Sequence, residues 1–217
     1  MERRYFLTAV GSAAAGLSGL TSALAQAQAS SPRAGVDYRR LERVAPVDAP
    51  VGKIELIEFF WYGCPHCNAF EPVLAQWVKT LPADVVFKRV PIAFQSSFVP
   101  QQQLFYALEA MGLVDKLHGQ VFAAIHRDRL KLATAADISA WVARQGVDAA
   151  AFANQFNSFS VVAKARRASQ LMEAYQVEGV PALGVAGRFY TDGELTRNMD
   201  RALQVTAFLI SEVRAGR

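Results

Sequence analysis

The arrangement that most restricts the fold is a strand–helix–strand pattern over residues 53–94, with the chain's two cysteines at its first junction. Residues 53–62, KIELIEFFWY, are rich in β-branched and aromatic side chains and predict a strand buried on both faces. Residues 68–80 carry apolar side chains at helical spacing, and residues 84–94 predict a second strand. Such a strand, helix and strand indicate a βαβ unit with parallel strands and a right-handed crossover.

The middle of the chain, residues 98–175, has helical periodicity almost throughout and predicts four or five helices in a row. Thr134 and Asp148 precede two of them and are expected to be N-caps.

Strand patterns return near the C-terminal end. Two short apolar runs around Ala186 and Gly187 predict a hairpin, and residues 198–213 predict a closing helix that buries Leu203, Ala207 and Ile210. The sequence therefore predicts an α/β fold: a βαβ unit and a ββα unit around one central sheet, interrupted by an all-helical insertion. We expect residues 26–96 and 176–217 to form the two parts of the sheet domain and residues 97–175 to form the insertion.

The first 25 residues have the pattern of a cleavable export signal. Arg3 and Arg4 precede a moderately apolar stretch that ends with Ala23 and Ala25, so cleavage is expected after Ala25. The paired arginines also resemble a twin-arginine signal, although a general secretory signal tolerates them equally well. A membrane anchor is the alternative, but the stretch is rich in small residues and no charged flank follows closely. Residues 26–50 predict an extended leader with a short edge strand at 37–44.

Composition and charge narrow the class of protein further. A chain of 217 residues, 52% hydrophobic and 19% charged, is typical of one globular core with or without an insertion. The formal net charge is +4, and the one basic run, KARRASQ at residues 164–170, is either a solvated helix face or an anion contact. Nothing in this distribution indicates nucleic-acid binding.

Three chemistries compete for the pair Cys64 and Cys67, which enclose Pro65 and His66. A zinc site needs about four ligands, and His118 and His126 lie in the predicted insertion with no second cysteine pair. A c-type haem needs CxxCH, whereas Asn68 follows here. A structural disulfide closing so short a loop would remove little chain entropy. A reversible dithiol remains, with no metal and no cofactor expected.

The placement of the pair supports redox chemistry. Cys64 follows a strand and begins a helix, so its sulfur should face the unpaired N–H groups and the positive dipole end of the first turn. Pro65 suits this first turn because its missing N–H is not needed there. His66 supplies a further positive or donor group. Cys67, one turn later and facing the core, is expected to be the resolving thiol, and Cys64 the thiol that a substrate reaches.

The direction of electron flow depends on the pKa of Cys64. A free thiol has a pKa of about 8.5, and helix N-termini with a neighbouring histidine lower it to as little as ~3.5. A pKa near ~4 at pH 7 would stabilise the reduced form by ~4 kcal/mol, or ~90 mV towards oxidising behaviour. Together with export to an oxidising compartment, this favours a donor of disulfides.

The motifs EFFWYGCPHC and GVPALGV, separated by a helical insertion, resemble the DsbA family of thiol:disulfide oxidoreductases. The resemblance covers nearly all of the chain after the signal, and CPHC is its most specific part. It implies a thioredoxin fold interrupted by a helical domain. Thioredoxins are similar in the placement of the cysteine pair, but they usually carry Gly-Pro between the cysteines and lack the insertion.

The resemblance also implies roles for particular residues. Val180–Pro181 matches a valine followed by a cis-proline that lies against the disulfide and offers backbone groups to an extended substrate. Glu58 matches a buried acidic residue that assists proton transfer. The alternative for Glu58 is a structural carboxylate paired with a base such as Lys88, because a buried ionisable group needs a partner or a shifted pKa.

The aromatic residues before Cys64 allow two interpretations. Trp61 and Tyr62 either shape an apolar substrate-binding surface around Cys64 or pack in the core. Gly63 departs from the family's best-known members, in which an aromatic residue is common at this place, and leaves the shape of the partner-binding groove open.

The expected function is therefore donation of the Cys64–Cys67 disulfide to reduced, unfolded or partly folded exported proteins in the periplasm. The resemblance implies reoxidation by a quinone-linked membrane partner of the DsbB type, and the protein is expected to be a monomer. One alternative is a disulfide isomerase or reductase, which usually adds a dimerisation domain. Kappa-type glutathione transferases share the architecture but typically carry serine at the place of Cys64. A non-catalytic, chaperone-like binder of unfolded chains is the alternative from another class.

Overall fold

The computed structural model describes Met1 and residues 31–217, so the predicted export signal lies almost wholly outside the described residues. Residues 32–217 form one compact unit. Its elements in chain order are β1 (Arg39–Arg40), β2 (Ile54–Phe60), α1 (Pro65–Val78), β3 (Val85–Pro91), the 3-10 turn η1 (Ser96–Phe98), α2 (Val99–Ala110), α3 (Val114–His126), α4 (Ala135–Arg144), α5 (Ala149–Phe156), α6 (Phe159–Ala174), β4 (Ala182–Val185), β5 (Phe189–Asp192), α7 (Gly193–Thr196) and α8 (Met199–Arg214).

The strands form one sheet in the order β1-β5-β4-β2-β3. β2 is parallel to β3 on one side and antiparallel to β4 on the other, and β4 continues into β5 through a hairpin. Three residues connect the paired Val185 and Phe189; Ala186 and Gly187 both have positive φ angles, and the N–H of Arg188 donates to the carbonyl of Val185 across the turn. The βαβ and ββα units thus share a sheet with β2 near its centre, and the predicted thioredoxin fold is confirmed.

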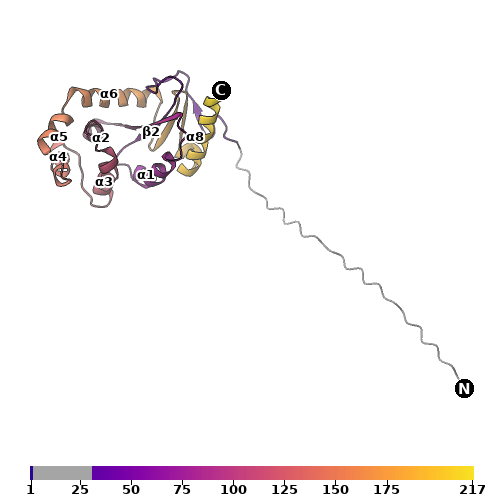
Figure 1. Cartoon of the computed structure of the whole chain (residues 1–217), viewed down its shortest axis with the longest axis horizontal. Helices are drawn as coiled ribbons and strands as arrows, with labels where there is room; N and C mark the ends of the chain where they lie inside the picture. The colour runs from indigo at the N-terminus through magenta and orange to yellow at the C-terminus, as the bar shows by residue number, and fades with distance from the viewer. Residues whose placement is uncertain (2–30) are drawn as a thin grey trace. The chain divides into compact units, whose positions relative to one another are not determined.

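Helices cover both faces of the sheet. On one face, α1 and α8 pack against β4 through Phe70, Leu74, Leu183 and Leu203. On the other face, α6 closes over β2, and the ring of Tyr175 lies 5.0 Å from that of Phe59. Figure 1 shows α6 and α1 on opposite sides of β2, with α8 at the end away from α4 and α5. All seven residues of β2 are buried, as its apolar pattern predicted.

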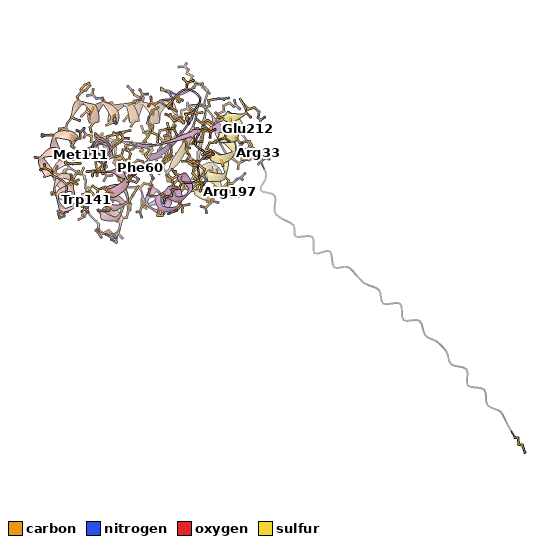
Figure 2. The ribbon with its side chains drawn as sticks, viewed as in Figure 1. Arg33, Phe60, Met111, Trp141, Arg197 and Glu212 are labelled. Atoms are coloured by element: carbon orange, nitrogen blue, oxygen red, sulfur yellow. The ribbon has the colours of Figure 1, made fainter. Side chains whose placement is uncertain are left out.

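Five α-helices, α2 to α6, separate β3 from β4 in the described part of the chain and constitute the insertion. Thr134 and Asp148 cap α4 and α5 by accepting hydrogen bonds from the N–H groups of Asp137 and Ala151, which confirms both predicted N-caps. Figure 2 places Phe60 in the middle of the unit and Trp141 among the insertion helices. Phe60 packs on Phe105 of α2 and Phe122 of α3, so the strand that leads to the cysteines is built into the insertion's core.

Two local predictions need correction. Only Arg39 and Arg40 of the expected edge strand pair with β5. Ala207 of the closing helix is exposed, because the buried stripe of α8 runs through Leu203, Thr206 and Ile210. The residue boundaries proposed for the insertion and the sheet domain stay predictions.

Within the described residues, no helix is both long enough and apolar enough to cross a membrane.

The contact between Tyr175 and β4 gives a test of how the insertion is joined to the sheet. A Cβ at Gly184 would lie 2.4 Å from Tyr175 Cε1, and the Tyr175 hydroxyl accepts a hydrogen bond from the N–H of Gly187. Gly184→Ala should therefore displace the ring and lower the free energy of unfolding by about 1–3 kcal/mol, the usual cost of overpacking a core.

Gly119→Ala is the matched control. Gly119 lies within α3, is exposed, and has no atom within 4 Å of an added Cβ. Alanine there should raise the free energy of unfolding by ~0.5–1 kcal/mol. Urea unfolding of both variants measures the difference, and equal effects would contradict the proposed packing.

Candidate active site

The two cysteines lie at the start of α1, shortly after the end of β2. Cys64 is the N-cap of α1 with an extended backbone, Pro65 occupies the first turn, and Cys67 follows one turn later. The side chain of Cys64 makes no capping hydrogen bond as a thiol. Both cysteines carry free thiols, so the structure represents the reduced state. A sulfur at this position is well placed to accept from the unpaired N–H groups once it is ionised.

The surroundings of Cys64 favour its thiolate. A hydrogen bond from the Cys67 thiol is the largest influence, and it outweighs burial, which acts in the opposite direction. The backbone N–H groups of Cys67 and His66 and the charge of His66 add to it, and together they lower the pKa of Cys64 to about 6. At pH 7 this stabilises the reduced form by ~1.4 kcal/mol, or ~30 mV. The pKa of Cys64 is lowered, as predicted, but less far than the value of ~4 considered from the sequence.

Cys67 is the opposite of Cys64 in its environment. Its side chain is fully buried, whereas Cys64 is 8% exposed. Burial raises the pKa of Cys67 far above the ordinary range, and the neighbouring Cys64 and Glu58 push it in the same direction. One thiol is thus held ready to ionise and the other is held protonated.

A loop from the far end of the sequence closes over the pair. The Val180–Pro181 peptide bond is cis, as the resemblance implies, and the Cys64 thiol donates a 3.3 Å hydrogen bond to the carbonyl of Val180. Beside this contact is a groove of about 410 Å³ whose lining includes His66, Pro181, Glu194 and Arg197. Arg197 is labelled in Figure 2.

Beneath the pair, three ionisable side chains form a buried cluster. Glu58, on β2, is 1% exposed, and its Oε2 lies 3.2 Å from Nε of Arg89 on β3. Arg89 Nη2 donates a 2.7 Å hydrogen bond to Glu71 Oε1 on α1. Burial raises the pKa of Glu58 to about 8, although Arg89 opposes the shift. Burial acts in the same sense on Glu71, but the neighbouring His118 and Arg89 together outweigh it and hold its pKa below the ordinary value.

The base beside Glu58 is therefore Arg89, and Lys88 as its partner is wrong; the two roles considered for Glu58, in proton transfer or as a structural carboxylate, both stay predictions. Lys88 bonds instead to Asp48. Neighbouring residues of a strand point to opposite faces, and the register places Arg89 opposite Glu58.

The insertion contributes to the same cluster through α3. His118 is 4% exposed, and its Nε2 lies 3.3 Å from Glu71 Oε2. A 2.8 Å hydrogen bond joins its Nδ1 to the hydroxyl of Tyr62. Tyr62 is itself 1% exposed and is held by His126, which donates to its carbonyl oxygen. Tyr62 is therefore packed in the core, where almost none of its surface is open to a substrate.

Trp61 lies at the edge of the site with its ring half-buried. It stacks on Phe98 with ring centroids 3.7 Å apart and an interplanar angle of 13°. The indole also covers Gly63, where an added Cβ would lie 2.3 Å from Trp61 Cζ2. The departure at Gly63 thus has a steric reason, because a side chain there would exclude the indole.

Most of the predicted site residues converge on one sulfur. Cys64, Cys67, His66, Val180 and Pro181 meet at the start of α1, and Glu58 lies below them. Sequence reasoning missed three members of the buried cluster, namely Arg89, Glu71 and His118. Strand alternation opposite Glu58 could have indicated Arg89, whereas no local signal joins His118 to this site.

Among the described residues, no group of three or more His, Cys, Asp and Glu side chains is arranged to hold a metal ion.

The fold and the paired thiols define a thioredoxin-fold protein with an active-site dithiol, and comparisons specify the family. Residues 55–204 match the model of the DSBA-like thioredoxin domain. The thiol:disulfide interchange protein DsbA of Burkholderia cepacia is 41% identical over 195 residues, which cover 90% of this chain and 92% of the relative. That of Bordetella parapertussis is 46% identical over 189 residues, covering 87% and 90%.

Solved structures agree with these relatives. The crystal structure of Pseudomonas aeruginosa DsbA superimposes with a TM-score of 0.81 at 40% identity, covering 85% of this chain and 96% of that one. The chain belongs to the DsbA family, and it is a thiol:disulfide oxidoreductase.

The unequal thiols give a direct test by ultraviolet thiolate absorbance. Titration of the reduced protein should show one step near pH 6, which disappears in Cys64→Ser. Because the folded pKa is depressed, the stability that this thiolate gives the reduced protein is fully present above about pH 9 and is lost as the pH falls through about 6. Unfolding of the oxidised protein should lack this dependence.

Substitution of Cys67 separates the causes of the shift. Cys67→Ala removes the main donor and should raise the pKa of Cys64, whereas Cys67→Ser retains a hydroxyl donor and should raise it less. Equal pKa values in the two variants would contradict the role of the Cys67 thiol.

The contact between Trp61 and Gly63 is tested by a double-mutant cycle. Gly63→Ala should displace the indole and lower the free energy of unfolding by ~1–3 kcal/mol. In a Trp61→Ala background the same change should cost little, since nothing then occupies the space. A cost that persists in this background would show that the backbone, and not the indole, requires glycine.

Proposed function

We propose that this protein donates its Cys64–Cys67 disulfide to reduced, unfolded or partly folded exported proteins. The observation that carries the proposal is the contrast between the two thiols. Cys64 is slightly exposed with a pKa of about 6, and Cys67 is buried with a pKa far above the ordinary range. Such a pair is more stable in the reduced state, so its disulfide is readily transferred to the thiols of a substrate.

The first step is attack by a substrate thiolate on Cys64 Sγ. A substrate–Cys64 bond forms, the Cys64–Cys67 bond breaks, and the bonding electron pair leaves on Cys67. Burial disfavours a thiolate at Cys67, so this sulfur takes up a proton. Glu58 is the proposed donor, because its raised pKa of about 8 leaves it protonated at pH 7.

The second step releases the product. The substrate's second thiolate attacks the substrate sulfur that is bonded to Cys64, and Cys64 departs as a thiolate. Its low pKa makes it a good leaving group. The substrate has then lost two electrons and the Cys64–Cys67 pair has gained two.

The groove beside Pro181 is the proposed substrate-binding surface. The carbonyl oxygen of Val180 lies 3.3 Å from Cys64 Sγ, and both Val180 and Pro181 line the groove with His66. Backbone groups in such a position bind an extended chain without regard to its sequence. Trp61 is proposed to add an apolar surface close by.

Reoxidation requires a partner that accepts two electrons from the dithiol. We propose a quinone-linked membrane protein of the DsbB type, the periplasm as the location, cleavage of residues 1–25, and a monomeric state. Support for export is the signal-like sequence of residues 1–25 together with an oxidising chemistry that needs such a compartment.

The decisive measurement is equilibration of the protein with glutathione redox buffers. A disulfide donor should be half-reduced in a buffer that still contains abundant glutathione disulfide, since the Cys64 thiolate stabilises its reduced form. A requirement for strongly reducing buffer, as for a thioredoxin-like reductase, would contradict the proposed direction.

Replacement of both cysteines by serine distinguishes catalysis from chaperone-like binding. The double variant should oxidise a reduced two-cysteine substrate no faster than the buffer does, while still binding the unfolded chain. Oxidation that survives the double replacement would overturn the assignment of Cys64 and Cys67.

A further inference from the structure

The buried cluster holds one arginine between two carboxylates, and it serves them unequally. Arg89 donates a well-formed hydrogen bond to Glu71, whereas its Nε approaches Glu58 Oε2 without making one. Glu58 and Glu71 therefore compete for the same cation. A hydrogen-bond donor that binds Glu71 from another direction therefore changes how strongly Arg89 interacts with Glu58.

His118 is such a group. Its Nε2 faces Glu71 Oε2, an oxygen that Arg89 does not bond, at 3.3 Å. A carboxylate only accepts hydrogen bonds, so the ring proton belongs on Nε2. Nδ1 is then free to accept from the Tyr62 hydroxyl 2.8 Å away. The neutral ring can thus donate to Glu71 while its other nitrogen is satisfied.

The surroundings of His118 fix the ring and limit what can act on it. Three aromatic rings pack edge-on against it, with centroids between 5.2 and 5.8 Å away, those of Phe60, Phe105 and Phe122. The ionisable groups that face it are Glu71 on α1, Tyr62 after β2 and, beyond Glu71, Arg89 on β3. Burial lowers the pKa of His118 although Glu71 opposes this, so the ring is neutral at pH 7.

The hydrogen bonds within the cluster are incomplete. Of the seven buried side-chain polar atoms without a hydrogen-bond partner in the described residues, four belong to it, namely Glu58 Oε2, Glu71 Oε2, Arg89 Nε and His118 Nε2. Each faces another member at a distance between 3.2 and 3.3 Å. Small movements are enough to exchange partners within it.

We propose that His118, a residue of the helical insertion, is a positioning residue that sets the charge state of Glu58 by sharing Glu71 with Arg89. When His118 donates to Glu71, more of Arg89 is available to Glu58, and the ionised form of Glu58 is stabilised. Without this donor, Arg89 interacts mainly with Glu71. Glu58 then stays protonated up to a higher pH.

The inference rests on the proposed role of Glu58 in moving the Cys67 proton. For the disulfide to re-form from a mixed disulfide, the Cys67 thiol must lose its proton to a base, and the resulting thiolate displaces the partner's sulfur from Cys64. Glu58 can accept that proton only in its ionised form. His118 would therefore adjust the pH range of this step without touching the reacting sulfurs.

The test measures Glu58 directly by carbon-13 NMR titration of glutamate carboxyl groups, with the signal assigned by its loss in Glu58→Gln. His118→Phe fills the aromatic site without a donor and should raise the pKa of Glu58 by about one unit, the scale of one charge-assisted hydrogen bond. His118→Gln keeps a neutral donor and should stay near the wild-type value. The rate of Cys67-dependent release of a mixed disulfide should shift along the pH axis in the same order.

Glu71→Gln supplies the decisive background. Removal of the Glu71 charge frees Arg89, so the pKa of Glu58 should fall, and His118→Phe should then have no further effect on it. Thermal unfolding of each variant confirms that it is folded, and His118→Leu replaces His118→Phe if the phenylalanine is too large. An unchanged Glu58 titration in the folded His118→Phe or His118→Leu variant, or an equal shift in the Glu71→Gln background, would overturn the inference. Failure of the wild-type protein to oxidise substrates would instead contradict the proposed function, since the NMR titration does not depend on activity.

Discussion

The structure depends on the unpaired N–H groups at the start of α1, which lie at the end of a fully buried strand. An N-cap residue normally satisfies such groups with a side-chain oxygen. Here the N-cap is Cys64, whose thiol makes no capping bond, so ionisation of the sulfur is what satisfies the helix end. β2 fixes this position because all seven of its residues are buried, with Leu56 packed in the cluster of α8 and Phe60 in the core of the insertion. The helix start thus brings the Cys67 thiol, the largest influence on the pKa of Cys64, and the N–H groups of His66 and Cys67 to the same sulfur.

A second constraint is the buried charge below the pair. A carboxyl group such as Glu58 is costly in a core, and its pKa of about 8 is the outcome of burial competing with Arg89. The same arginine also serves Glu71, which His118 contacts from the insertion. Two segments that the sequence separates by the whole of α2 therefore meet in one electrostatic unit. The insertion is more than a cover for the sheet, because one of its side chains belongs to the polar network beneath the site.

The aromatic residues around Cys64 divide according to burial. Tyr62 is enclosed and joins the site to α3, whereas Trp61 lies half-buried over Gly63 and stacks on Phe98. Gly63 leaves room for the indole over the chain just before Cys64. The groove beside Pro181, on the other hand, is bordered by His66, Glu194 and Arg197, so polar and charged groups flank the site there.

Much of the fold and the reacting pair could be predicted from the sequence by itself. The β2 pattern, the helix start at Cys64, the caps Thr134 and Asp148 and the hairpin at Ala186 are local features, and spacing along the chain determines them. Tertiary structure decided what faces Glu58. Strand register brought Arg89 and not Lys88 opposite it, and helix packing brought His118 to Glu71. Side chains far apart in sequence meet only through packing, and the pKa values of buried groups depend on those neighbours more than on residue type.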